Sequence, residues 1–380
     1  FSEFVNSPDP FLAKYDSKGK MEWYINPVES DYGYGSAIIP TPTGSVIWAG
    51  TYSGSMKFPF KGETVTYPDP PFTDNDDSFI FEVDSLGEIS RHMRTTGKGL
   101  LYFDEGSYDA AGNLYLTGFI QGAVVIKAAD KDYPIDSKTS DQKFFILQIK
   151  PDWSIGWHIF SEGEFSYGRG VEVNSDGDLV FAGYYSGKET FSSLDGLNNV
   201  TLSSLGEDDI FMGKYSTDGE LLEVYSIGGI SNDFLHSMYL DEKDQLYLSG
   251  SFVNEMDIDP SENTKFITSG LGAPALLVLK YTNKFNHVWS YFTGSGVNFG
   301  EDAVGLGIVG EDVMVAGNFS SKVNFNPNGE DELILQGGSD GYLVRLSNPE
   351  AISTSIKNIK EYSFNIFPNP AQDKLSISLN

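Results

Sequence analysis

Short apolar segments recur along the chain at a nearly constant spacing, and each of them ends at a glycine. They read VIWAG to Gly50, LYLTG to Gly118, LVFAG to Gly183, LYLSG to Gly250 and VMVAG to Gly317. A fixed period of this size, roughly 66 residues, indicates a repeat architecture in which each copy is one supersecondary unit.

Two further markers keep the same phase. The apolar segment FLAKYD returns as FIFEVD, FILQIK, FMGKYS, LVLKYT and YLVRLS. Trp23, Trp157 and Trp289 occupy one position in alternate copies, and Arg91 and Glu223 take it in the intervening copies. A ligand site is normally unique whereas a packing position repeats, so we predict that these tryptophans pack between copies instead of stacking on sugar rings.

Each copy contains four short segments, called a to d, that are rich in β-branched and aromatic residues and separated by turn residues. In the third copy they are Gly170 to Asn174, Leu179 to Ala182, Ile210 to Tyr215 and Leu221 to Ser226, with Asp-Gly corners at Ser175–Gly177 and Thr217–Gly219. Asp-Gly corners favour tight hairpins, which make neighbouring strands antiparallel. We therefore predict an all-β fold, a β-propeller of four-stranded antiparallel blades, with about five to six blades in this chain.

The copies are longer than a usual blade, and the excess lies between b and c, as in Phe119 to Gln142. This excess predicts a protruding loop or an added hairpin. A parallel β-helix or an array of immunoglobulin-like domains fits the corners and the period less well. The sequence begins at a c segment and the repeats end after another, so we expect that blades are missing and that both ends are truncated.

The repeats resemble the SBBP-type propeller repeats of secreted Bacteroidetes proteins. The resemblance spans residues 1–347 and rests on the c segment followed by a turn, as in KYDSKG from Lys14, EVDSLG from Glu82 and KYSTDG from Lys214. That family often has an acidic stretch after strand b, which this chain keeps as Asp257-Ile258-Asp259-Pro260.

Beyond the repeats, residues 348–362 have the composition of a linker. Residues 363–380 resemble the opening of the type A C-terminal sorting domain of type IX secretion, in the positions Phe367, Pro368, Asn369, Pro370, Ala371, Asp373, Leu375 and Ile377. The resemblance implies export by the type IX secretion machinery, so the protein is expected to be secreted or held at the outer-membrane surface.

The amino-acid composition narrows the kinds of partner that this protein can bind. With 25 Lys and Arg against 54 Asp and Glu, the net charge is −29, which disfavours nucleic acid and anionic membrane surfaces as partners. Cysteine is absent, which excludes disulfides and thiolate chemistry. No apolar run approaches the roughly 18 residues of a membrane helix, so we expect no membrane insertion.

Candidate chemistry is sparse. Common hydrolase, phosphate-loop and calcium-loop motifs are absent. Asp257 and Asp259 are the best candidate ligands for Ca²⁺, because alternating carboxylates ahead of a proline turn can point to one side. The acidic clusters before strand c, DNDD at 74–77, EDD at 207–209 and EDE at 330–332, are expected to be solvated loop charge.

These observations predict a secreted or cell-surface binding propeller without enzymatic activity, which captures an extracellular protein or glycan. Two alternatives remain open. One is a propeller glycoside hydrolase or lyase in which strand a carboxylates such as Glu172 and Asp302 converge in the central channel; two carboxylates about 5 to 10 Å apart would favour it. The other is a structural spacer that displays another domain.

Overall fold

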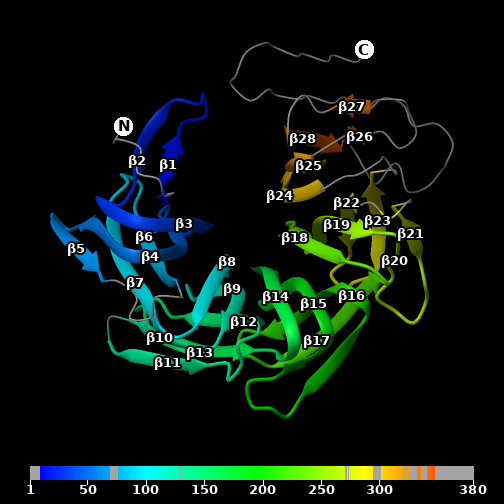
Figure 1. The fold of residues 1–380 in the computed structure, drawn as a ribbon, viewed down its shortest axis with the longest axis horizontal. Coiled ribbons are helices and arrows are strands. Elements are labelled where there is room, and N and C mark those ends of the chain that lie inside the picture. The colour runs from blue at the N-terminus through cyan, green and yellow to red at the C-terminus, as the bar shows by residue number, and fades with distance from the viewer. Residues whose placement is uncertain are drawn as a thin grey trace. The chain divides into compact units, whose positions relative to one another are not determined.

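The computed structural model contains strands and no helix in the residues it describes, which are 9–68, 76–128, 130–269, 272, 274–293, 301–319, 322–325, 332–334 and 340–346 (Figure 1). No helix in this part of the chain is thus long and apolar enough to cross a membrane. Four blades of four strands each follow one another along the described chain, within sheets of seven, four, six and four strands. The predicted fold class, an all-β propeller, is confirmed.

The chain divides into two compact units. The first contains Phe1–Val173, Phe191–Asn199 and Ser216–Leu221, and the second contains Asn174–Thr190, Val200–Tyr215 and Leu222–Asn380. The first unit holds a two-stranded sheet, blade 1, of β1 (Leu12–Tyr15) and β2 (Met21–Ile25). Blade 2 consists of β3 (Glu29–Pro40), β4 (Val46–Phe60), β6 (Asp77–Val83) and β7 (Ile89–Gly97), with β5 (Glu63–Tyr67) paired to β4. Blade 3 consists of β8 (Leu100–Tyr108), β9 (Leu114–Gln121), β12 (Lys143–Ile149) and β13 (Ile155–Phe160).

Blade 4 contributes residues to both units and consists of β14 (Glu162–Val173), β15 (Asp178–Ser192), β16 (Asn199–Ser216) and β17 (Leu221–Gly229). In the second unit, blade 5 consists of β18 (Asp233–Leu240), β19 (Leu246–Val253), β22 (Pro274–Tyr281) and β23 (His287–Phe292). The described strands of blade 6 are β24 (Glu301–Val309), β25 (Asp312–Phe319) and β28 (Asp340–Leu346), and β26 (Lys322–Asn324) pairs with β27 (Glu332–Ile334).

The excess residues between strands b and c form hairpins. In blade 3 they make β10 (Ala123–Lys127) and β11 (Asp132–Asp136), and β10 pairs with β7, the outer strand of the preceding blade. In blade 5 they make β20 (Glu255–Asp257) and β21 (Phe266–Thr268), and β20 pairs with β17 in the same manner. In blade 4 the b and c strands themselves lengthen, to 15 and 18 residues. The prediction of an added hairpin is confirmed, and strands b and c of the third copy are longer than predicted.

The glycine that ends each b segment has a steric cause. In blades 2, 3, 5 and 6 strand a shifts register opposite this glycine, at Gly35/Ala37, Phe103/Glu105, Leu235/Ser237 and Ala303/Gly305. In three of these blades a carbonyl of strand a occupies the space of a β-carbon: one added at Gly50 would lie 2.0 Å from Tyr34 O, at Gly118 1.9 Å from Tyr102 O and at Gly250 1.9 Å from Phe234 O. Only glycine fits these positions.

The tryptophan marker also has a structural cause. In blades 1, 2 and 3 the side chain at this position of strand d donates a hydrogen bond to a carbonyl in the c–d turn of the following blade, whereas Trp289 Nε1 of blade 5 is buried and has no partner among the described residues. The pairs are Trp23 Nε1 to Ser85 O, Arg91 Nη1 to Pro151 O and Trp157 Nε1 to Thr217 O, each at 3.0 Å. In blade 4 the neighbouring strand c supplies the donor, Lys214 Nζ to Asn283 O at 2.5 Å. The accepting carbonyls follow one another at the period of the repeat, so this contact recurs from blade to blade.

The hydrophobic core lies mainly on strands b and c. Leu114, Leu116, Phe181, Leu246, Leu248, Phe211 and Leu277 are buried, and strands such as β9 and β12 are buried on both faces along nearly their whole length. One expectation is wrong: the last acid of the clusters before strand c is not solvated, because Asp77 and Asp209 are each only 1% exposed. Asp77 is the first residue of β6, and Asp209 begins the buried part of β16, so protein groups replace water around both carboxylates.

Candidate functional site

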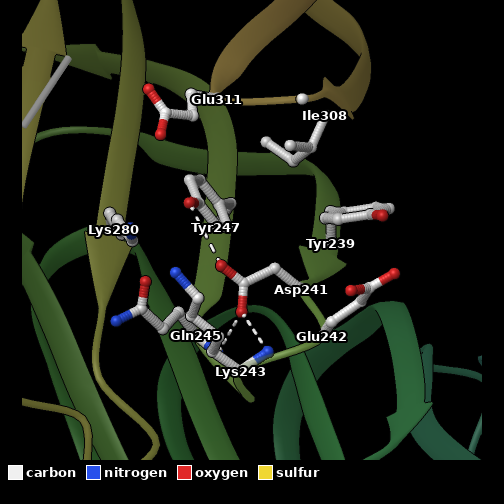
Figure 2. Close-up of a pocket in the computed structure, with 10 residues that line it drawn as sticks. Tyr239, Asp241, Glu242, Lys243, Gln245, Tyr247, Lys280, Ile308 and Glu311 are labelled. Carbon is white, nitrogen blue, oxygen red and sulfur yellow. Dashed lines mark hydrogen bonds between the residues drawn. The ribbon is translucent and has the colours of Figure 1, made fainter. Parts of the chain in front are cut away.

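An open polar cleft of about 410 Å³ lies in the second unit, between the turn that joins β18 to β19 and the turn that joins β24 to β25 (Figure 2). We call it the inter-turn cleft. Its lining residues are Tyr239, Asp241, Glu242, Lys243, Gln245, Tyr247, Lys280, Ile308, Gly310 and Glu311. The volume is within the range of small-ligand sites, but this lining is polar where such sites are usually apolar.

Asp241 organises the floor of the cleft. Its Oδ1 accepts the backbone N–H groups of Lys243 and Gln245, each at 2.9 Å, and its Oδ2 accepts the Tyr247 hydroxyl at 3.3 Å (Figure 2). Burial raises the pKa of the Tyr247 hydroxyl, and the neighbouring Lys280 acts in the opposite direction. The tyrosine therefore stays protonated and donates its hydrogen bond at neutral pH.

The turn between β8 and β9 of blade 3 corresponds to the turn between β18 and β19, two repeats later, and we call it the matched turn. Comparing the two turns shows which features of the cleft are repeated. In the matched turn Tyr115 donates to Asp109 Oδ2 at 3.0 Å, so the Tyr–Asp pair recurs and is part of the turn. Other positions differ: Glu242 and Lys243 correspond to Ala110 and Ala111, Tyr239 to Ser107, and Lys280 to Gln148. Relative to the matched turn, the inter-turn cleft therefore gains two exposed charged side chains and an aromatic ring, whereas the lysine at position 280 also occurs in other copies of the repeat, as Lys14 and Lys214.

A second group of polar residues lies on strands β8 and β14 of the first unit. Arg169 Nη1 pairs with Asp104 Oδ1 at 3.3 Å. Burial, then the charges of Glu172 and Asp104, raise the pKa of Glu105 to about 8. Burial also raises the pKa of Glu172, against a hydrogen bond from Ser107. At neutral pH Glu105 therefore retains a proton.

The carboxylates of Asp257 and Asp259 are partly engaged within their own loop. Asp257 Oδ1 accepts the N–H of Asp259 at 3.1 Å and of Lys265 at 2.7 Å. Asp259 Oδ1 accepts the N–H and hydroxyl of Ser261, and these bonds hold the pKa of Asp259 below its usual value. The described residues contain no group of three or more acidic or histidine side chains placed to hold a metal ion. Calcium binding at this pair stays a prediction.

Other predicted positions lie outside the described residues. The sorting motif from Phe367 to Ile377 and the linker are among them, as is the side chain of Asp302. Sequence reasoning singled out Glu172 but missed Glu105, and it missed the inter-turn cleft completely. The available signal was divergence from the repeat, because Glu242 and Lys243 replace a pair of alanines in an otherwise matching turn.

Comparisons with known proteins give no family assignment. No protein-family model and no curated protein matches the chain. Among solved structures, a protein of unknown function from Bacteroides caccae aligns over 74% of this chain and 93% of its own, with 12% identity and a TM-score of 0.30. The extracellular domain of a putative hybrid two-component system from B. thetaiotaomicron aligns over 88% of this chain and 62% of its own, with 11% identity and a TM-score of 0.20.

Proposed function

We propose that this protein is an extracellular binding propeller without enzymatic activity, and that its ligand is a glycan held in the inter-turn cleft. The observation that carries the proposal is the set of cleft side chains that the matched turn lacks. Glu242, Lys243 and Glu311 are exposed and supply charged hydrogen-bonding groups around an opening of about 410 Å³. Tyr239 and Tyr247 add aromatic rings in edge-to-face contact, with centroids 6.5 Å apart. Hydroxyl-rich ligands need both kinds of contact.

A glycan array probed with the purified chain tests this proposal, followed by calorimetry with the glycan that binds. The double variant Glu242→Ala with Lys243→Ala restores the residues of the matched turn and should weaken binding at least tenfold, about 1.4 kcal/mol. The control is Lys20→Ala with Glu88→Ala, which removes one exposed charge of each sign from c–d turns and should bind as the wild type does. The proposal fails if no glycan binds or if the Glu242/Lys243 variant binds with unchanged affinity.

A specific observation favours a second candidate, the glycoside hydrolase or lyase. A carboxyl group that stays protonated at neutral pH can act as a general acid, and Glu105, which lies near Glu172, has a pKa of about 8. The test is turnover of polysaccharide substrates between pH 5 and 9. Activity that falls above about pH 8 and that Glu105→Gln abolishes would support the enzyme, and absence of turnover on every substrate tried would remove it.

Extracellular placement rests on the resemblance of residues 363–380 to a type IX sorting domain. The experiment fuses a complete terminal domain of this kind, beginning with these residues, to a reporter in a host with the type IX machinery. We expect the reporter in the medium or on the cell surface. Retention of the reporter in the periplasm would contradict the assignment.

A further inference from the structure

Two buried carboxylates come together where blade 4 leads into blade 5. Asp209 is 1% exposed and Asp233 is fully buried. Asp209 Oδ2 accepts the N–H of Leu205 at 2.9 Å, and Asp233 Oδ2 accepts the N–H of Gly229 at 2.6 Å. The Oδ1 atoms of both aspartates are buried and have no partner within hydrogen-bonding geometry in the described part of the chain, although the backbone N–H groups of Gly229 and Val253 lie close enough to lower the pKa of Asp209 and of Asp233, respectively, against the larger effect of burial. Buried carboxylate oxygens without a partner are costly, so this arrangement requires a balancing group.

Blade 2 shows what balances the same position two repeats earlier. Asp77, which corresponds to Asp209, lies 3.8 Å from Arg94 Nη1 and 3.5 Å from the Tyr52 hydroxyl. The Thr96 side chain forms a further hydrogen bond to the Asp77 carboxylate. A buried carboxylate at the start of strand c is therefore paired with a guanidinium group and two hydroxyls.

Blade 4 keeps the tyrosine and loses the other two partners. Tyr185 corresponds to Tyr52, but Arg94 is replaced by Ser226 and Thr96 by Gly228. The pairing register confirms this correspondence, because Gly229 lies opposite Met256 just as Gly97 lies opposite Val124. A positive charge is thus removed from a site that keeps its buried carboxylate.

The same site also gains a second carboxyl group. Asp233 stands where blade 3, two repeats earlier, has Leu101, so an apolar side chain is replaced by a second carboxylate. Burial and then the charge of Asp209 raise the pKa of Asp233, to about 8, which shows how unfavourable two bare charges are here. Relative to blade 2, the site has lost one positive charge and gained a second carboxyl group, which keeps its proton at neutral pH because its pKa is about 8.

Oxygen atoms are present at the position that the arginine leaves. A β-carbon at Gly228 would lie 2.3 Å from both Cγ and Oδ1 of Asp209, so the Asp209 carboxylate fits here only because residue 228 is glycine. The hydroxyl groups of Tyr185 and Ser226 are 2.8 Å apart, and the charge of Asp209 acts on Tyr185. Hard divalent cations take carboxylate, hydroxyl, carbonyl and water oxygens in flexible combinations.

We propose that Asp209 and Asp233 bind one divalent cation of the calcium type through their free Oδ1 atoms, and that this ion replaces the arginine of blade 2. Two carboxylates neutralise its charge, and neutral oxygens complete the coordination. The site is distinct from the Asp257 and Asp259 pair, which lies at the end of β20 and in the loop that follows, and whose Oδ1 atoms accept backbone N–H groups of that loop.

The test measures terbium luminescence excited through tyrosine, its displacement by calcium, and thermal unfolding in EDTA and in millimolar calcium. For the wild type we expect saturable luminescence that calcium quenches, and a rise in Tm of roughly 5 to 10 °C at a hundredfold excess over Kd. Asp233→Leu, which installs the blade 3 residue, should abolish both signals. Asp257→Asn with Asp259→Asn should leave both signals unchanged.

A charge-restoring variant keeps the proposal testable if a single substitution unfolds the protein. Ser226→Arg with Asp233→Leu rebuilds the charge balance of blade 2 and should unfold at the same temperature in EDTA and in calcium. The proposal is overturned if the wild type shows neither luminescence nor a calcium-dependent Tm. It is also overturned if the Asp257/Asp259 variant loses both signals while Asp233→Leu keeps them.

Discussion

The substitution Gly250→Ala tests directly why a glycine recurs at the end of each b segment. The added β-carbon would lie 1.9 Å from Phe234 O and 3.2 Å from Leu235 Cα, whereas ordinary contacts begin near 3.4 Å. Strand β18 would have to shift away from β19, in a pair joined from Asp233 to Leu240. Backbone atoms cannot move aside as the end of a flexible side chain does, so the clash weakens several ladder hydrogen bonds. We expect a loss of about 3 kcal/mol in the free energy of unfolding.

The assay is thermal unfolding followed by far-ultraviolet circular dichroism, with Gly307→Ala as the matched control. Gly307 lies on the a strand of the next blade, and a β-carbon there would meet no atom within 4 Å. Gly250→Ala should lower the Tm by roughly 6 to 12 °C, whereas Gly307→Ala should leave it unchanged or raise it, because glycine loses more backbone entropy on folding than alanine does. Equal melting temperatures for the two variants would refute the steric explanation of the repeated glycine.

Single side chains give two further tests. The pKa of Glu105 is raised from 4.5 to about 8 in the folded state, so the folded protein binds this proton more tightly, and stability should fall as pH rises from about 4.5 to 8. Glu105→Gln should flatten this part of a plot of Tm against pH. An unchanged slope would contradict the buried proton. Trp157→Phe removes the 3.0 Å hydrogen bond to Thr217 O, but this oxygen still accepts a longer bond of 3.4 Å from Gln148. The free energy of unfolding, measured with urea, should therefore fall by only about 0.5 to 1 kcal/mol. An unchanged free energy of unfolding would mean that this contact between blades is energetically neutral.

The fold class could be predicted from the sequence, because the period and the apolar segments depend on local geometry and burial. The glycine that ends strand b and the Asp-Gly corners mark positions where the backbone admits few residues, so they recur visibly. Buried positions such as Leu116 and Leu248 lie in the apolar b segments that recur in the sequence. The hairpin between b and c was predictable as an excess of chain.

Which strand each hairpin joins, and which acids are buried, depends instead on contacts between blades. The pairing of β10 with β7 brings together residues from consecutive blades, and no local pattern encodes that partner. Asp77 and Asp209 look alike in sequence, each at the end of an acidic cluster, yet Arg94 accompanies one and a second carboxylate accompanies the other. Charge balance is a property of side chains that meet across strands, so it becomes visible only when the repeats are compared in space.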